Sequence, residues 1–315
     1  MTRSSFLLLS LFAASTLVAC AAEDGTGIED DALEPVGETT QGVVGAGRRV
    51  CSWNARRLGN NFDDLPKNMD AAVKVVRDNC DLISLQEVMA TSGGTANGFD
   101  QLLAKMGTRY WGGVITDHAV PAPQTSNSER YAFIYRKSAV SLCDGWNGVQ
   151  FMNDVENVFI REPAWACFKI KSSATELVLA GYHALFGSPV ERKREIGFLD
   201  DDIDRNGTPD DLFEAMKASR PGSPDVMLIG DFNLKPHELA EVLPRYVDLT
   251  AGVGSTLNQS NEVTDNQYDH AMVPAGSRLL GGTEPATTLD VRSVVPGNKF
   301  YQTVSDHLPI RLILK

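Results

Sequence analysis

The sequence predicts an α/β fold in which the strands of a mixed sandwich are accompanied by only a few helices. Apolar runs of strand length recur along the whole folded region, whereas helical periodicity is found between only some of them. A strictly alternating barrel would need a helix after each strand, so a mixed sandwich fits better. The predicted strands are Val50 to Trp53, Leu82 to Leu85, Tyr131 to Tyr135, Ala164 to Ile170, Leu177 to Tyr182, Val226 to Ile229, Ala271 to Val273 and Leu308 to Leu314.

Three stretches have the apolar spacing of helices. The first has Pro66 in its first turn, where a proline is tolerated, the second ends at Gly107 as its stop, and the third follows Pro236. Their apolar positions are Leu65, Met69, Val73 and Val76 in the first, Phe99, Leu102, Leu103 and Met106 in the second, and Leu239, Val242 and Leu243 in the third.

Residues 48–315 are predicted to form one domain. This region is long enough for a single large core or for two small ones. It contains no Pro/Ser-rich linker and no internal repeat that would divide it. One domain is therefore the simpler interpretation.

Residues 1–19 have the pattern of an export signal. Arg3 supplies a short positive region, and Phe6 to Val18 is a largely apolar segment that is too short to span a membrane comfortably. The run Leu17-Val18-Ala19-Cys20 resembles the lipobox of bacterial lipoproteins. That resemblance implies cleavage before Cys20, a lipid on its sulfur, and an exported protein anchored to the bacterial cell envelope, at the outer membrane surface or released from it. A plain signal peptide with a chance cysteine is the alternative.

Residues 20–47 are predicted to be a flexible acidic tether. They include no Lys, Arg or aromatic residue, so they cannot bury enough apolar surface to fold. Of the chain's 41 acidic and 29 basic residues, seven acids and Arg3 precede residue 48, which leaves 34 acids against 28 bases and a net charge of −6 for the rest. The sequence has no basic stripe of the kind that binds nucleic acid. Non-specific DNA affinity is therefore expected to be weak, unless a metal ion offsets the repulsion between the acidic protein and the DNA phosphates. The seven acids are Glu23, Asp24, Glu29, Asp30, Asp31, Glu34 and Glu38.

Polar side chains stand at the ends or starts of several predicted strands. Asp231 and Asn233 directly follow Val226 to Ile229, an unbroken apolar run typical of a strand buried on both faces. An extended backbone would turn Asp231 and Asn233 to the same side, whereas an Asx turn closing the strand is the ordinary structural explanation. The set of such residues is Asn54, Gln86, Glu87, His183, Asp231, Asn233, Asp269, His270, Asp306 and His307.

These residue types together indicate hydrolysis of phosphate esters. The transition state gathers negative charge on phosphoryl oxygens, so a hard divalent cation on oxygen ligands is the expected stabiliser. Glu87 and Asn54, with Asp306, are candidate ligands, and two histidines with acidic partners are suited to proton transfer. The sequence has no Gly-rich phosphate loop, no Cys/His zinc spacing and no Gly-x-Ser-x-Gly elbow that would favour another chemistry.

In their residues and in their order along the chain, these motifs resemble those of the endonuclease/exonuclease/phosphatase superfamily, and most closely those of its deoxyribonuclease I-like members. The resemblance extends from about Val50 to Leu314 and implies a four-layer sandwich of two mixed β-sheets flanked by helices. It rests on Trp53-Asn54, Gln86-Glu87-Val88, Ser128-Glu129-Arg130-Tyr131, Arg161-Glu162-Pro163, His183, Gly230-Asp231-Phe232-Asn233, Tyr268-Asp269 and Ser305-Asp306-His307-Leu308-Pro309.

The resemblance also implies a role for each matching residue. The metal would be Mg²⁺, or Mn²⁺ in its place, with Glu87 as the principal ligand. The two histidines would be the proton-transfer groups, although which is the acid and which the base stays open. The remaining implied roles are Asn54 and Asp306 as metal supports, Asn54 and Arg161 as phosphate contacts, Glu129 as the partner of His183, Asp269 as the partner of His307, and Asp231 with Asn233 as the positioners of phosphate and attacking water.

Two departures from the resemblance concern DNA contact. The position two after Glu87, an arginine that enters the minor groove in deoxyribonuclease I, is Met89 here. The position two before Glu129, a stacking tyrosine there, is Asn127. The groove contacts are therefore expected to differ even where the hydrolytic residues match.

Asp202 to Asp210 is a candidate calcium loop outside that pattern. It has oxygen-bearing side chains at positions one, three, five and nine, with Gly207 at six, as in the first part of an EF-hand loop. Position twelve is Phe213, so the usual bidentate glutamate is absent there. An acidic surface loop with no ion is the alternative to a structural Ca²⁺ site. The candidate residues are Asp202, Asp204, Asn206, Thr208 and Asp210.

Four cysteines besides Cys20 permit two disulfides, with three possible connectivities in an exported chain. The family fold would place the strands bordered by Cys51 and Cys80 next to each other, and likewise those of Cys143 and Cys167. These pairs are therefore predicted, with free buried thiols as the alternative.

The sequence therefore predicts a surface-tethered, Mg²⁺-dependent phosphodiesterase, with non-specific cutting of DNA as the leading function. A sphingomyelinase-like or inositol-phosphate phosphodiesterase or phosphatase is the alternative. A non-catalytic binding protein is disfavoured, because such a protein would be free to lose some of the hydrolytic residues. We expect a monomer with nucleic acid as the substrate and a membrane contact through Cys20.

Overall fold

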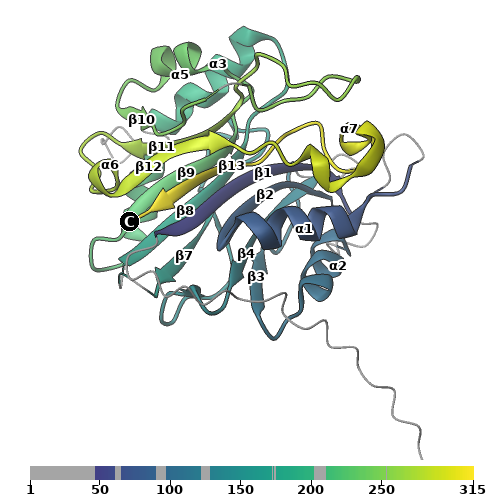
Figure 1. Ribbon diagram of the computed structural model, residues 1–315. Helices are drawn as coiled ribbons and strands as arrows, with labels where there is room; N and C mark the ends of the chain where they lie inside the picture. The colour runs from purple at the N-terminus through teal and green to yellow at the C-terminus, as the bar shows by residue number, and fades with distance from the viewer. Residues whose placement is uncertain are drawn as a thin grey trace, which may run out of the picture. The chain divides into compact units, whose positions relative to one another are not determined.

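Two mixed β-sheets lie face to face, and helices cover the outer side of each (Figure 1). The computed structural model describes residues 47–60, 65–89, 97–121, 128–171, 173, 175–201, 211–252 and 254–315. The signal and tether predictions for residues 1–19 and 20–46, Asn127, and the proposed calcium loop Asp202–Asp210 lie outside these residues.

The first sheet has six strands in the described residues, in the order β12-β13-β1-β2-β4-β3. Its one parallel pair is β1 with β2, and the other neighbours run antiparallel. The strands are β1 (Arg48–Leu58), β2 (Leu82–Met89), β3 (Trp111–Ile115), β4 (Glu129–Arg136), β12 (Thr283–Thr288) and β13 (Ile310–Leu314).

The second sheet has seven described strands, in the order β10-β11-β9-β8-β7-β5, with β6 also paired to β7. Here β8 and β9 are the parallel pair. The strands are β5 (Val140–Leu142), β6 (Gln150–Phe151), β7 (Ala164–Ile170), β8 (Thr175–His183), β9 (Asp225–Asp231), β10 (Tyr246–Asp248) and β11 (Asp269–Pro274).

The helices are short and irregularly spaced along the chain, as the strand-rich sequence predicts. The α-helices are α1 (Met69–Asn79), α2 (Asn97–Met106), α3 (Pro189–Gly197), α4 (Asp211–Ala218), α5 (Pro236–Val242), α6 (Leu279–Gly282) and α7 (Phe300–Thr303). The 3₁₀-helices are η1 (Phe198–Asp200), η2 (Arg292–Val294) and η3 (Pro296–Asn298).

Three groups of buried apolar residues separate the four layers. One fills the space between the sheets, a second lies between the first sheet and helices α1 and α2, and a third lies between the second sheet and helices α3 to α5. Strand β9 shows how a strand serves two layers, because Val226 and Leu228 face the helices while Met227 and Ile229 face the other sheet. The predicted fold class and the burial of this strand on both faces are confirmed.

Helix α1 begins later than the sequence pattern predicts. Leu65 was placed in the helix, but it lies outside and is 42% exposed. The helix starts at Met69 because the Asn68 side chain accepts a hydrogen bond from the Ala71 N–H and caps the first turn. Helices α3 and α4 were not predicted from the sequence.

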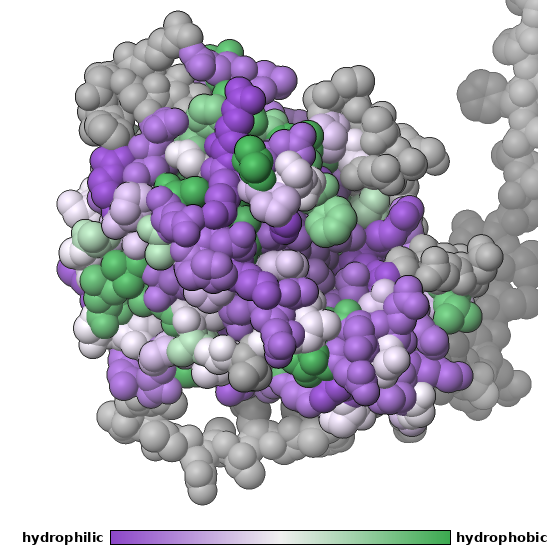
Figure 2. Space-filling view, turned by 90° about the horizontal axis from the view of Figure 1, so that it is seen from above, coloured by the Kyte–Doolittle hydropathy of each residue, from purple (hydrophilic) through white to green (hydrophobic). Residues whose placement is uncertain are grey.

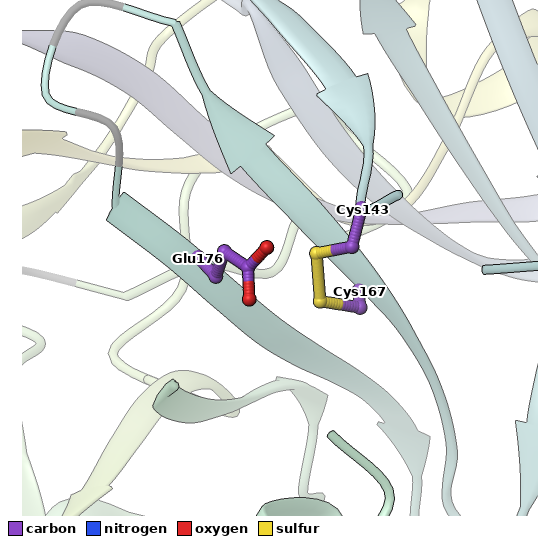
Figure 3. Close-up of side chains that lie close together, drawn as sticks. All are labelled: Cys143, Cys167 and Glu176. Atoms are coloured by element: carbon purple, nitrogen blue, oxygen red, sulfur yellow. A yellow bond between two sulfur atoms is a disulfide. The ribbon is translucent and has the colours of Figure 1, made fainter. Parts of the chain in front are cut away.

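Both predicted disulfides are confirmed. Cys51 of β1 bonds to Cys80, which follows α1, and Cys143 bonds to Cys167 of β7. The second disulfide lies beside Glu176 of β8 (Figure 3). Its sulfurs are bonded to each other, so this cluster does not offer thiolate ligands to a metal.

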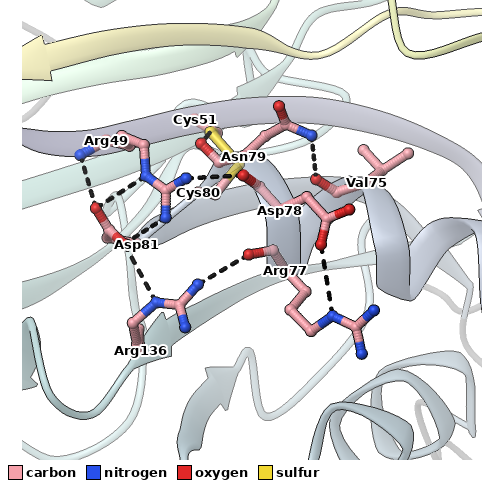
Figure 4. The surroundings of a disulfide bond; sticks show 9 residues. All are labelled: Arg49, Cys51, Val75, Arg77, Asp78, Asn79, Cys80, Asp81 and Arg136. Carbon is pink, nitrogen blue, oxygen red and sulfur yellow. Dashed lines mark hydrogen bonds and ion pairs between the residues drawn. A yellow bond between two sulfur atoms is a disulfide. The ribbon is translucent and has the colours of Figure 1, made fainter. Parts of the chain in front are cut away.

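An ion cluster beside the first disulfide joins three neighbouring strands (Figure 4). The buried carboxylate of Asp81, just before β2, accepts hydrogen bonds from Arg49 of β1 at 2.9 and 3.2 Å and from Arg136 of β4 at 3.3 Å. The two arginines also donate to the carbonyl oxygens of Arg77 and Asp78 at the end of α1. One carboxylate thus holds the first sheet and its covering helix together.

The face seen from above in Figure 1, to which α3 and α5 contribute, is mostly hydrophilic, with hydrophobic residues in small separate groups (Figure 2). Within the described parts of the chain, no helix has both the length and the apolar character needed to cross a bilayer.

We predict that Asp81→Asn lowers the free energy of unfolding by about 1–3 kcal/mol, the range for a hydrogen-bonded charged group. Burial raises the pKa of Asp81, but Arg49 and Arg136 outweigh it, so the pKa lies below its ordinary value. The carboxylate therefore stabilises the fold above its unfolded-state pKa of about 3.9, and this contribution is lost as pH falls through the folded-state pKa.

Urea unfolding at pH 7 and at pH 3 measures this effect. Asp78→Asn is the matched control, because its side chain makes a solvent-exposed ion pair with Lys74 and should contribute under about 1 kcal/mol. Equal stability of the wild type and Asp81→Asn at pH 7 would contradict the prediction.

Candidate active site

The topology brings strand ends from both sheets to one place. The parallel strands β8 and β9 end together, with His183 in register with Asp231. The antiparallel strand β11 starts where β9 ends, so Asp269 also pairs with Asp231. In the first sheet Asn54 and Glu87 lie near the ends of the parallel pair β1 and β2, and Glu129 starts the antiparallel strand β4 opposite the end of β2.

Irregular backbone turns two of these strand ends toward the site. The register between β1 and β2 shifts between Asn54 and Leu58, and that between β2 and β4 shifts between Leu85 and Val88. Glu87 has a φ of 55°, a left-handed conformation that is uncommon for a residue with a side chain. Bulges of this kind re-aim side chains next to active sites.

Asp231 lies at the centre of the polar groups. Its Oδ2 accepts a hydrogen bond from Asn54 Nδ2 at 3.1 Å and lies 3.7 Å from His183 Nε2 and 3.4 Å from His307 Nε2. The residue is 1% exposed. Burial raises the pKa of Asp231, but His307, His183 and the hydrogen bonds outweigh it, so the pKa is lowered and the group is an anion.

His183 is held from its other side by Glu129. Nδ1 of His183 lies 2.7 Å from Glu129 Oε1, and Arg161 Nε lies 3.0 Å from the same oxygen. Arg161 also donates to the carbonyl oxygens of His183 and Ala184. Burial and Arg161 lower the pKa of His183, but Glu129 and Asp231 outweigh them, so the pKa is raised above its ordinary value.

His307 has the same arrangement on the opposite side. Its Nδ1 lies 2.8 Å from Asp269 Oδ2, and its backbone N–H donates to Ser305 Oγ at 3.0 Å. Burial lowers the pKa of His307, but Asp269 and Asp231 outweigh it and hold the pKa well above its usual range. Each histidine therefore has its own carboxylate at Nδ1, and the two histidines share Asp231 at Nε2.

Asn233 follows Asp231 in a tight turn. Its backbone N–H donates to Asp231 Oδ1 at 2.9 Å, which is the Asx turn considered from the sequence. Asn233 has a φ of 52°, so it is not extended, and its Nδ2 donates to the Ala184 carbonyl at 3.2 Å. The preceding Gly230 is needed for close approach, because a Cβ there would lie 1.9 Å from the Tyr182 oxygen.

A group of oxygen atoms next to Asp231 fits a hard divalent cation. Glu87 Oε1 accepts a hydrogen bond from Asn54 Nδ2 at 3.0 Å, and Oε2 accepts one from the Arg57 N–H at 2.9 Å. Asp306 Oδ2 lies 3.4 Å from Arg56 Nε, while its buried Oδ1 has no hydrogen-bond partner among the described residues. A buried carboxylate oxygen without a partner is the environment that a bound cation would satisfy.

Asn54 bridges the metal-candidate residues and Asp231. Its Nδ2 faces both Glu87 and Asp231, and its Oδ1 accepts from the Arg56 N–H at 3.0 Å. This orientation fits a residue that positions the two carboxylates. The structure thus places all the predicted magnesium, phosphate and catalytic residues in one neighbourhood, and their catalytic roles stay predictions.

Several supporting residues were not predicted from the sequence. The Lys67 ammonium donates to the carbonyl oxygens of Ala55, Arg56 and Val304, which ties the end of β1 to the segment before Asp306. Burial lowers the pKa of Lys67 to about 7, although Glu87 and Asp306 oppose that change. No local sequence pattern marks such a residue, because its partners are up to 237 positions away.

Buried Glu195 of α3 organises the loops on the His183 side. Its two oxygens accept hydrogen bonds from Tyr182 Oη, the Leu185 N–H and the Ile160 N–H, at 2.8 to 3.0 Å. These contacts fix the residue before Arg161 and the residues on either side of His183. The glutamate of a short helix carried no signal of this role in the sequence.

Known proteins are similar to this chain over most of its length. The sequence model of the Endonuclease/Exonuclease/phosphatase family matches residues 51–307. A deoxyribonuclease of Thioalkalivibrio sp. (strain K90mix) is 28% identical over 285 residues, which cover 85% of this chain and 71% of that protein. Human deoxyribonuclease-1-like 1 is 26% identical over 282 residues, which cover 85% and 84% of the two chains.

Solved structures share the fold of this chain. The crystal structure of truncated Caenorhabditis elegans TDP2 superposes with a TM-score of 0.55 at 17% identity and covers 85% of this chain and 97% of that one. A likeness at this identity concerns the fold, and it agrees with the four layers described above. The match over most of the chain and the sequence relatives together show that this chain belongs to the Endonuclease/Exonuclease/phosphatase family and is a hydrolytic phosphodiesterase.

Proposed function

We propose that this protein is a Mg²⁺-dependent endonuclease that cuts DNA without sequence specificity. The observation that carries the proposal is the buried Asp231 carboxylate shared by His183 and His307, each of which has its own carboxylate partner. Two sequence relatives that carry the name deoxyribonuclease support the choice of substrate. Members of this family generally use divalent metal ions, with Mg²⁺ proposed here and Mn²⁺ as a substitute.

Two imidazoles on either side of one anion suit paired proton transfers. Protonated, each ring can donate from Nε2 to a phosphate or leaving oxygen, and neutral, it can accept a proton from water. Glu129 and Asp269 bind Nδ1 and therefore keep Nε2 directed toward Asp231. Asp231 and Asn233 would orient the attacking water, and the Arg161 guanidinium beside His183 would contact a phosphate oxygen.

The metal would be held by Glu87 and Asp306, with Asn54 as a further support. When bound, it would neutralise negative charge on the phosphoryl oxygens. Asn54 would keep Glu87 and Asp231 apart at a fixed spacing, because it donates to both carboxylates. Arg56 places positive charge 3.4 Å from Asp306, and Lys67, when protonated, adds positive charge close to Glu87 and Asp306 and limits their mutual repulsion.

DNA contact is expected to differ from that of deoxyribonuclease I. Met89 is 3% exposed, so it does not extend into a groove. The Arg56 guanidinium lies 3.4 Å from Asp306 Oδ2, so a DNA phosphate bound at the metal would meet this positive charge. Phosphate contacts of this kind favour binding without sequence selection.

One observation favours a lipid phosphodiesterase as the second candidate. Phe186 is 79% exposed and Val190 is 77% exposed, and both follow closely after His183. The Leu185 N–H donates to Glu195 and the Ser188 N–H donates to Glu191, which fixes the loop that carries Phe186, while Val190 lies in the first turn of α3. An apolar pair at the edge of a hydrolytic site is suited to contact with a lipid surface.

We further propose that the protein is exported and anchored to the cell envelope by a lipid on Cys20. The two disulfides support an oxidising compartment. The acidic residues 20–47 would then act as a tether for a monomeric enzyme at the membrane surface. A structural Ca²⁺ at Asp202–Asp210 stays a prediction from the sequence, and calcium-rich surroundings would suit it.

We predict that purified protein without residues 1–19 nicks plasmid DNA in the presence of Mg²⁺, and that EDTA abolishes this nicking. His183→Ala should lower turnover by about 10²–10⁴-fold, the usual contribution of a general acid or base. His237→Ala is the matched control, because His237 is exposed on α5. Inositol phosphates, RNA and sphingomyelin vesicles complete the panel.

If the plasmid stays intact and phosphocholine is released from sphingomyelin, the protein is a lipid phosphodiesterase and the nuclease proposal is wrong. In that case Phe186→Ser should weaken vesicle hydrolysis without changing hydrolysis of a soluble diester. Near-normal activity of His183→Ala on every substrate would mean that the proton-transfer role is misassigned.

The pH prediction concerns Glu129→Gln. Glu129 raises the pKa of His183, and Arg161, which lowers it, would remain nearby. Removing the carboxylate should therefore shift the His183-dependent limb of the pH–rate profile to lower pH. If the acidic limb moves, His183 acts as the base, and if the alkaline limb moves, it acts as the acid. A profile with both limbs unmoved would contradict the assigned pairing.

A further inference from the structure

His270, the residue after Asp269 on β11, is buried and uses both ring nitrogens. Nδ1 lies 2.7 Å from Asp248 Oδ2 on β10. Nε2 lies 2.9 Å from the Leu234 carbonyl oxygen and 3.0 Å from the Gln267 carbonyl oxygen. The side chain is 0% exposed, so the described protein atoms supply its surroundings.

The hydrogen-bond partners determine the charge of this ring. A carbonyl oxygen has no proton to give, so Nε2 must carry one. The Asp248 carboxylate accepts a hydrogen bond from the Thr250 N–H at 2.8 Å, and an imidazole is more basic than a carboxylate. The proton between Asp248 and Nδ1 therefore belongs to the ring, and His270 is an imidazolium.

This cation joins the two segments that carry the central catalytic groups. Leu234 directly follows Asn233, and Gln267 precedes Asp269 by two residues and donates from its side chain to the Asp269 carbonyl at 2.8 Å. Between the same segments, the Phe232 N–H donates to the Tyr268 carbonyl at 2.8 Å. The rings of His270 and Phe232 also pack in a T-shaped arrangement, with centroids 5.7 Å apart.

We propose that His270 is a positioning residue that stays positively charged at neutral pH and clamps residues 231–234 against residues 267–269. Through this clamp it sets the separation of Asp231 from His307, whose partner is Asp269. Its effect on turnover rests on the proposed function of the site, whereas its charge does not. No reacting group contacts His270 directly among its described partners.

The charged groups around the ring support this state. Asp248 faces it from β10, Asp269 precedes it on β11, and its register partner on β9 is the uncharged Gly230. Burial lowers the pKa of His270, but Asp248, the Leu234 carbonyl and Asp269 outweigh it, so the pKa is raised. The clamp is therefore complete below the ordinary histidine pKa of about 6.5 and is lost only as pH rises through the higher folded-state value.

The charge can be measured without any substrate. We expect ¹⁵N NMR of the imidazole rings in the wild type to show both His270 nitrogens protonated at pH 7.5, with His270→Gln identifying the signals. The exposed His118 and His237 supply reference signals from rings in contact with solvent. A neutral His270 tautomer at pH 7.5 would overturn the proposal, whatever the enzyme acts on.

The positioning role is measured by kinetics on plasmid DNA and on a soluble aryl phosphodiester. His270→Gln should lower kcat by about 10–100-fold, the cost of displacing a reacting group by about 1 Å, with KM nearly unchanged. His270→Arg keeps the charge and the donors, so it should recover most of the lost kcat and extend the active range on the alkaline side. His237→Gln is the matched control on the surface.

The outcomes separate the two proposals. Full kcat in His270→Gln, or a His270→Arg variant as slow as His270→Gln, would overturn the positioning role. A wild type that hydrolyses no phosphodiester would instead defeat the proposed function and the positioning role together, while the NMR result would still decide the charge of His270. If His270→Gln does not fold, the wild-type NMR spectrum and the His270→Arg kinetics remain decisive.

Discussion

The ion pairs of the buried Asp231 carboxylate are the interaction on which the rest of the site depends. Glu129, His183, Asp231, His307 and Asp269 form a row in which acids and histidines alternate, with neighbouring polar atoms 2.7 to 3.7 Å apart. An isolated buried carboxylate would be costly, but this one has a cation on each side and two N–H donors. Removing either histidine therefore disturbs a network, since the remaining members keep charges that were balanced by it.

The backbone of both sheets is irregular where their strands end at the site. Parallel pairs in both sheets end beside one another, and the strand ends leave regular geometry with left-handed residues at Glu87 and Asn233. Such conformations persist only where the surroundings over-determine them. Near the opposite ends of β1 and β2, the Cys51–Cys80 disulfide and Asp81 with its two arginines hold the first sheet.

Cations in the protein balance acids that catalysis requires. Arg161, Lys67, Arg56 and His270 each bind backbone carbonyl oxygens of segments that carry catalytic residues. They therefore do two things at once: they reduce the repulsion among the carboxylates and they fix the chain. This arrangement explains how a region with a net charge of −6 can gather five carboxylates in one neighbourhood and still leave a site suited to a phosphate ester.

Much of the fold and the site follows from local sequence. Unbroken apolar runs predicted the central strands, because a strand and its ends are determined by a few neighbouring residues. The polar residues at the strand ends were predicted to form one group, which includes Asn54, Glu87, His183, Asp231 and His307. The start of helix α1 was predicted too early, since the cap supplied by Asn68 competes with apolar spacing. The sequence left an extended backbone and an Asx turn open for Asn233, and its hydrogen bond to Asp231 together with its left-handed conformation shows the turn.

The sequence by itself thus determined which residue types are available for hydrolysis and on which strands they lie. The tertiary structure decided which carboxylate faces which histidine, that Glu195 and Lys67 support the site, and that His270 must be charged. These properties depend on partners between 3 and 237 positions away and on burial from water, so local composition and spacing do not contain them. Asp231 is buried from water and lies between His183 and His307 only when the two sheets pack together. That packing therefore determines the charge and the reactivity of these side chains.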